Sequence, residues 1–184
     1  MKLKTLLTLG VCGILTGCSA PQIDDFKDAK PEFIPQEYFN GPMTAYGMVK
    51  DRDGKVIRRF KGKLVGSWDK NGVGTLDEKF VYDDGEELTR VWTLTPTGEA
   101  KTFIGTAGDI VGDAKMVAKG NTVMIDYVMT VPYKDTTIDI SVRDWLHLQE
   151  DGVILNHSKM KKFGFEVGEL VITIIKDFPT QSKQ

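Results

Sequence analysis

Residues 55–95 read KVIRRFKGKLVGSWDKNGVGTLDEKFVYDDGEELTRVWTLT, and this stretch decides the fold. Three runs in which apolar and polar residues alternate, at 55–68, 75–82 and 88–95, are separated by the turn dipeptides Asn71-Gly72 and Asp84-Gly85. Alternation places the apolar side chains on one face of a strand. Asn-Gly and Asp-Gly supply the positive backbone angles that tight hairpins need. The stretch therefore predicts three consecutive antiparallel strands.

The same pattern continues on both sides of this stretch, with no long apolar period of 3.6 residues. Further turn dipeptides are Asp53-Gly54, Thr97-Gly98, Gly120-Asn121 and Asp151-Gly152, and the remaining strand-like runs lie at 42–50, 101–107, 113–118, 122–131, 136–149, 153–162 and 165–176. Many consecutive strands in one small domain usually close on themselves, because closure removes exposed edges. We expect an all-β fold, an antiparallel meander that closes into a lipocalin-like or calycin-like barrel of about 8–10 strands. An open sandwich of two sheets is the alternative.

The amino terminus carries a localisation signal. Leu15-Thr16-Gly17-Cys18 follows two lysines and a short apolar run, which is typical of a bacterial lipoprotein signal. The run is too short to remain as a membrane-spanning helix. We expect cleavage before Cys18, lipidation of that cysteine, and stable attachment through more than one acyl chain. Ser19 favours the periplasmic face of the outer membrane. An ordinary cleaved signal peptide followed by a chance cysteine is the alternative.

These features divide the chain into four parts. We expect a lipoprotein signal peptide at 1–17, a lipidated N-terminus and extended tether at 18–39, one β-barrel domain at 40–178, and a C-terminal tail at 179–184. The tether is predicted from three prolines that lie among charged residues, a composition that favours extended chain.

Composition excludes several classes of chemistry. The net charge is −2, and removal of residues 1–17, which hold two lysines and no acid, leaves −4 without a basic stripe for nucleic acid. Cys12 leaves with the signal and Cys18 is lipidated, so no thiol remains for a disulfide, a metal or catalysis. His147 and His157 make a weak metal site at best. We therefore expect no cofactor, no metal and no enzyme activity, and no protein partner is predicted.

Three neighbouring strands each place one charged residue among the apolar residues of the inward face. Arg58 shares its face with Val56, Phe60, Leu64 and Trp68; Glu78 with Leu76, Phe80 and Tyr82; and Arg90 with Leu88, Trp92 and Leu94. Because an unpaired charge in a low-dielectric interior is costly, these three residues should interact. Two positive charges against one negative charge leave a positive surplus.

One interpretation of this surplus is an internal site for an anionic amphiphile. Arg58 and Arg90 would hold the head group, Glu78 and Tyr82 would complete the polar end, and the tail would lie among aromatic side chains. The candidate ligand-binding residues are Arg58, Glu78, Tyr82, Arg90, Trp68, Trp92 and Phe60. The alternative is an internal network of salt bridges completed by Asp126 or Asp144.

A set of short motifs resembles one known family. The motifs are Phe39-Asn40-Gly41-Pro42, Ala45-Tyr46-Gly47, Arg58-Arg59-Phe60, Gly66-Ser67-Trp68, Gly74-Thr75-Leu76-Asp77-Glu78-Lys79-Phe80, Tyr82-Asp83-Asp84-Gly85, Arg90-Val91-Trp92, Gly105-Thr106-Ala107-Gly108-Asp109 and Lys162-Phe163-Gly164-Phe165. In this order they resemble the DUF3833 family of bacterial lipoproteins. The resemblance implies an envelope lipoprotein whose activity is unassigned, and gene neighbourhoods in the family suggest a role in maintaining membrane lipids.

Three functions remain open from the sequence. The first is a membrane-tethered barrel that binds a lipid or other anionic amphiphile. The second is a structural or interaction lipoprotein of the envelope whose barrel is filled by its own side chains. The third is a hydrolase-like enzyme that uses the inward carboxylate of Glu78, for which a shifted pKa would be required. We expect the neighbouring arginines to keep Glu78 ionised, which disfavours the third function.

Overall fold

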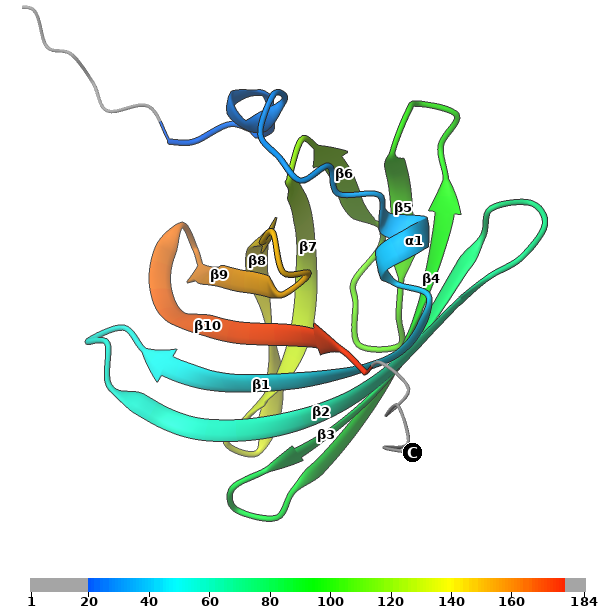
Figure 1. The fold of residues 1–184 in the computed structure, drawn as a ribbon. Helices are drawn as coiled ribbons and strands as arrows, with labels where there is room; N and C mark the ends of the chain where they lie inside the picture. Colours follow the sequence, from blue (N-terminus) through cyan, green and yellow to red (C-terminus); the bar gives the residue numbers. More distant parts are fainter. Residues whose placement is uncertain (1–19, 178–184) are drawn as a thin grey trace, which may run out of the picture.

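The chain folds into one closed antiparallel barrel of ten strands (Figure 1). The computed structural model describes residues 20–177. The strands are β1 (Gly41–Asp51), β2 (Val56–Trp68), β3 (Gly74–Tyr82), β4 (Glu87–Pro96), β5 (Thr102–Thr106), β6 (Ala114–Lys119), β7 (Thr122–Tyr133), β8 (Thr136–Leu148), β9 (Ile154–Lys162) and β10 (Phe165–Lys176). Each strand pairs with the next, and β10 pairs with β1 to close the ring. The predicted meander barrel is confirmed, and the alternative of an open sandwich is wrong.

The alternating pattern forms the barrel wall as the sequence predicts. On β2, the inward row alternates large side chains with glycine, so Phe60 and Leu64 are buried and flank Gly62. A Cβ atom on Gly62 would lie 2.7 Å from the Phe80 ring, so the glycine makes room for that ring. In the hairpin turns, Gly72 and Gly85 have φ angles of 76° and 86°, which glycine adopts without strain.

Two short helical segments cover one end of the barrel. They are η1 (Ile23–Phe26) and α1 (Pro35–Tyr38), and the chain that joins them runs over the ends of β6 and β7 (Figure 1). Phe26 packs on Trp145, with ring centroids 5.6 Å apart. Phe33 is fully buried, and its backbone N–H donates to the carbonyl of Gly120 at 2.7 Å.

Hydrogen bonds fix this segment to the barrel. The Tyr38 hydroxyl donates to the carbonyl of Gly152 at 2.7 Å, and the Trp68 indole N–H donates to the carbonyl of Phe39 at 2.7 Å. The expected extended tether is therefore wrong for residues 23–39. Their aromatic side chains bury apolar surface on the barrel, which outweighs the extended tendency of a proline-rich composition.

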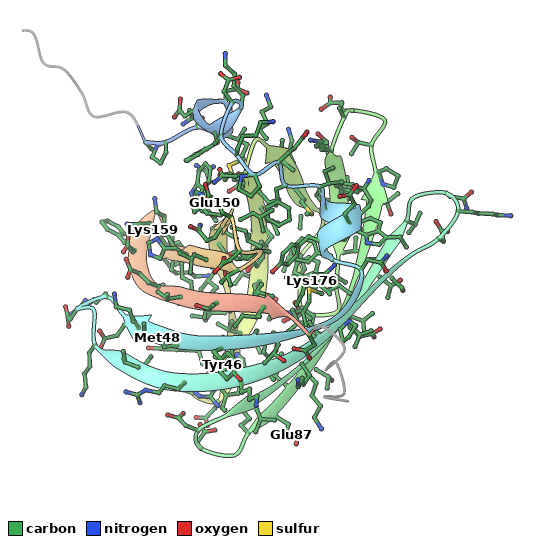
Figure 2. The ribbon with its side chains drawn as sticks, viewed as in Figure 1. Tyr46, Met48, Glu87, Glu150, Lys159 and Lys176 are labelled. Carbon is green, nitrogen blue, oxygen red and sulfur yellow. The ribbon has the colours of Figure 1, made fainter. Side chains whose placement is uncertain are left out.

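The two ends of the barrel differ. Because a meander alternates its connections, the β2–β3, β4–β5, β6–β7 and β8–β9 connections share the covered end, hereafter the closed end. The other five hairpins surround the opposite end, hereafter the open end, and the two helical segments lie away from it. In Figure 2, Glu150 marks the closed end and Glu87 the open end.

The described core is one cluster of buried residues that begins at Phe33 and ends at Ile174. A chain that starts at Ala20 therefore contains the whole described core. The expected signal peptide, the lipidation site Cys18 and the tail at 179–184 lie outside the described residues. Within residues 20–177, no helix has the length and apolar character needed to cross a membrane.

Candidate ligand-binding cavity

The barrel encloses a cavity of about 440 Å³. Most of its wall is apolar, and the inward rows of several strands contribute to it, among them Phe60, Leu76, Trp92, Ile140 and Ile172. Pockets for small ligands usually occupy roughly 300 to 1,000 Å³ and are lined in this way. The cavity therefore has the size and the lining of a site for a small apolar or amphiphilic molecule.

The cavity is sealed at one end and accessible at the other. At the closed end its wall is made of buried side chains, including Phe39 and Leu94. At the open end the lining residues Ile57 and Pro132 are exposed, Ile57 to 55%. A ligand would therefore enter between the hairpins of the open end.

The open end also carries exposed aromatic side chains. Phe163 and Phe165, at the β9–β10 hairpin, are 88% and 77% exposed, and Tyr133 lies at the β7–β8 hairpin. Lys162 places its ammonium group 4.9 Å from the centroid of the Phe163 ring. An apolar molecule would thus meet apolar surface before it reaches the cavity.

A cluster of charged groups interrupts the apolar wall between the two ends. Arg90 on β4 donates from Nε to Asp109 Oδ1 at 2.9 Å and from Nη2 to Asp109 Oδ2 at 2.6 Å. Its third nitrogen, Nη1, lies 3.7 Å from Glu78 Oε2, too far for a hydrogen bond. Asp109 comes from the β5–β6 connection, so a loop residue neutralises the inward arginine.

Across the cavity, Tyr127 on β7 and Asp144 on β8 extend this cluster. The Tyr127 hydroxyl donates to Asp144 Oδ2 at 3.2 Å, and its ring packs edge-on against Trp92 with centroids 5.7 Å apart. Asp144 Oδ1 and Glu78 Oε2 are buried without a hydrogen-bond partner. Ser158, fully buried, lies directly opposite Asp144 in the β8–β9 ladder.

Burial changes the ionisation of both carboxyl groups. Desolvation raises the pKa of Glu78 to about 7, since it outweighs the attraction of Arg90. Desolvation likewise raises the pKa of Asp144 to about 6, against the favourable effects of its polar neighbours. The expectation that arginines keep Glu78 fully ionised is therefore wrong, because Arg90 bonds to Asp109 and Arg58 lies elsewhere.

Arg58 does not join the cluster. Its Nη2 donates to Asp84 Oδ1 at 3.0 Å and to Glu86 Oε2 at 2.9 Å, both on the β3–β4 hairpin, and the guanidinium stacks over Tyr82. The inward row of β2 reaches the open end at this residue, where the acidic hairpin binds the guanidinium. The predicted clamp of Arg58 with Arg90 is therefore not formed.

The other candidate residues divide between the cavity and the closed end. Phe60, Tyr82 and Trp92 line the cavity as expected, together with Glu78 and Arg90. Trp68 is not part of the cavity wall. The inward row of β2 ends there, and the indole ring packs on Phe103 and hydrogen-bonds to the segment that covers the closed end.

Two residues of the cluster escape prediction from the sequence. Asp109 lies in a connection, where alternation gives no inward or outward assignment. Tyr127 lies in the inward row of an apolar strand, and its hydroxyl group, the polar group of that row, was the sequence feature that could have indicated it. Of the two acids proposed to complete a network, Asp144 faces the cavity, whereas Asp126 pairs with Arg143 at 2.6 Å outside the cavity wall. The cluster therefore holds more acids than bases, the reverse of the expected surplus.

Metal-ligating residues do not gather in the part of the chain that the structure describes. Within residues 20–177, no group of three or more histidine, cysteine or acidic side chains could hold a metal ion. His147 Nδ1 lies 2.9 Å from the Thr122 hydroxyl, and His157 Nε2 lies 3.4 Å from Glu169 Oε1. Both histidines thus contact polar side chains of neighbouring strands.

The fold and the cavity define a class, closed antiparallel β-barrels with an internal cavity open at one end, and the lipocalin-like expectation is consistent with it. Residues 12–176 match the family model described as "Protein of unknown function (DUF3833)". The chain belongs to this family, as its motifs predict. No curated protein matches the chain.

Proposed function

We propose that this protein binds an amphiphile inside its barrel. The observation that supports this most directly is the apolar cavity of about 440 Å³, which is accessible at the open end and contains a polar cluster within its wall. An amphiphile needs both kinds of surface: apolar side chains around its tail and fixed polar groups at its head. A barrel filled by its own side chains would leave no such space, so the cavity favours binding over the purely structural alternative.

We also propose that the protein is a bacterial envelope lipoprotein, anchored through Cys18 in the outer membrane at its periplasmic face. The amino-terminal motif and the resemblance to a lipoprotein family support this location. Only Ser19 lies between Cys18 and Ala20, so the two residues are at most about 7 Å apart. The closed end would then lie near the anchoring membrane and the open end would point away from it, a suitable orientation for exchanging lipids during membrane maintenance.

The binding proposal is tested with a chain that starts at Ala20, which lacks the proposed lipidation site. Dodecan-1-ol, below its solubility limit, should displace a fluorescent apolar probe from the wild-type chain with one site per barrel. Ile172→Trp should weaken binding at least tenfold, because Ile172 lines the cavity and a larger ring occupies its space.

The matched control is Ile175→Trp, on the same strand but 38% exposed and outside the cavity wall. This control should bind like the wild type. Equal binding by both variants, or no displacement of the probe by any twelve-carbon amphiphile, would contradict binding in the cavity.

The anchoring proposal is tested with the full chain. Bacteria grown with labelled palmitate should incorporate the label into the wild type and not into Cys18→Ser. A Cys18→Ser chain that keeps the label, or a wild type without it, contradicts lipidation at this cysteine.

A further inference from the structure

The charges around the cavity discriminate between head groups. The cluster contains the carboxyl groups of Glu78, Asp109 and Asp144 against one guanidinium, that of Arg90. Arg90 is already engaged, since Nε and Nη2 both donate to Asp109. A carboxylate or phosphate placed here would add a fourth acid beside an occupied base, and like charges at short range in a low dielectric repel strongly.

The hydrogen-bonding capacity of the cluster also disfavours an anionic head group. Glu78 Oε2 and Asp144 Oδ1 are buried acceptors without donors, and both residues line the cavity. Buried acceptors are nearly always satisfied in folded proteins, so each of these is open to a donor. Ser158 is the side chain across the ladder from Asp144. The side-chain donors beside Glu78 are the Trp92 indole and Arg90, whose Nη1 lies 3.7 Å from Glu78 Oε2, too far for a hydrogen bond.

We propose that the barrel selects amphiphiles whose head group donates hydrogen bonds and is neutral or cationic, a hydroxyl or an ammonium, and that Glu78 and Asp144 accept those hydrogen bonds. This inference rests on the proposed function and reverses the sign of the head group expected from the sequence. An ammonium group forms charge-assisted hydrogen bonds with carboxylates. A hydroxyl group can donate to a carboxyl group in either ionisation state, because a free acceptor oxygen remains in both. The tail then lies among the apolar side chains of the same cavity.

The experiment compares three ligands with the same twelve-carbon tail on the chain that starts at Ala20. Dodecan-1-ol, dodecylammonium and dodecanoate are titrated below micelle formation at pH 7.5, with displacement of one fluorescent probe as the readout. Dodecanol and dodecylammonium should bind at least tenfold more tightly than dodecanoate. Dodecanoate binding equal to or tighter than both would overturn the inference and leave the proposed function intact. Failure of all three ligands would overturn the proposed function itself.

Variants then assign the selectivity to residues. Glu78→Gln and Asp144→Asn, made separately, should each reduce the preference for dodecylammonium over dodecanoate at least fivefold, because each removes one negative charge. Asp126→Asn, whose carboxylate pairs with Arg143 outside the cavity wall, should leave the preference unchanged. A preference unaffected in both folded cavity variants, or changed equally in Asp126→Asn, would contradict the assignment. For each variant the readout is the ratio of its affinities for dodecylammonium and dodecanoate. A partial loss of folded protein therefore does not produce the same change.

Discussion

Arg90 on β4 and Asp109 in the β5–β6 connection form a two-pronged ion pair, with Nε to Oδ1 at 2.9 Å and Nη2 to Oδ2 at 2.6 Å. The same connection is tied to β7, where the Thr130 N–H donates to the Asp109 carbonyl at 2.9 Å. The pair thus closes a loop onto the barrel wall. It also takes up the guanidinium that Glu78 would otherwise bind, so one contact determines both local stability and the ionisation of the cavity.

Asp109→Asn should therefore have two effects. Loss of the charge leaves Arg90 with a weaker partner, and breaking one side of a largely buried pair costs about 2 to 4 kcal/mol of unfolding free energy. Arg90 becomes available to Glu78, so the pKa of Glu78 should fall from about 7. Urea unfolding and carboxyl titration by NMR measure the two effects. Asp113→Asn, an exposed acid of the same connection, should show neither.

The raised pKa of Glu78 should also appear in the pH dependence of stability. A carboxyl group whose pKa is about 7 when folded and 4.5 when unfolded holds its proton more tightly in the folded state. The contribution of this group to stability is therefore greatest below pH 4.5 and is lost as the pH rises through 7, by about 3 kcal/mol at most. Glu78→Gln does not titrate and escapes this loss.

The comparison of Glu78→Gln with the wild type isolates that effect, since Asp144 is present in both. Between pH 5 and pH 8 the stability of Glu78→Gln relative to the wild type should rise by about 1 to 3 kcal/mol in urea unfolding. Glu87→Gln, at an exposed acid of the β3–β4 hairpin, is the matched control. A difference between Glu78→Gln and the wild type that stays constant over this pH range would show that the pKa of Glu78 is not raised.

Gly66→Ala should loosen the closed end. A Cβ atom at Gly66 would lie 2.1 Å from the Phe39 carbonyl oxygen, the same atom that accepts the Trp68 indole hydrogen bond. The backbone must move, which costs about 1 to 3 kcal/mol. Trypsin should then cut faster after Lys27 in the covering segment. Gly108→Ala, where a Cβ atom has nothing within 4 Å, is the matched control and should leave the rate unchanged.

The strands were predictable because the same local rule governs each of them. Every predicted run has a strand, and Asp-Gly and Asn-Gly dipeptides mark hairpins because their backbone requirements are local. Alternation also places Glu78 and Arg90 in the cavity wall correctly. It also places Arg58 in the inward row of β2, but that row reaches the open end at Arg58, where the nonlocal acidic β3–β4 hairpin binds the guanidinium.

The rest of the site depends on contacts that no local pattern encodes. Asp109 reaches Arg90 from a connection, so the charge balance of the cavity could not be counted from strands alone. The covering segment has the prolines and charges of a tether, yet the Phe33 N–H and the Tyr38 hydroxyl donate hydrogen bonds to carbonyls in the distant β6–β7 and β8–β9 connections. Long-range packing, rather than composition, decides its structure.

The most direct test of amphiphile binding is native mass spectrometry of the chain that starts at Ala20, purified from cells without detergent. We expect a one-to-one complex of the barrel with a co-purified amphiphile whose head group is neutral or cationic. The mass of the bound amphiphile should be unchanged after prolonged incubation. Ile172→Trp should be found without this ligand and Ile175→Trp with it. A wild-type barrel that is folded, empty and unable to take up added dodecan-1-ol or dodecylammonium would contradict amphiphile binding in the cavity.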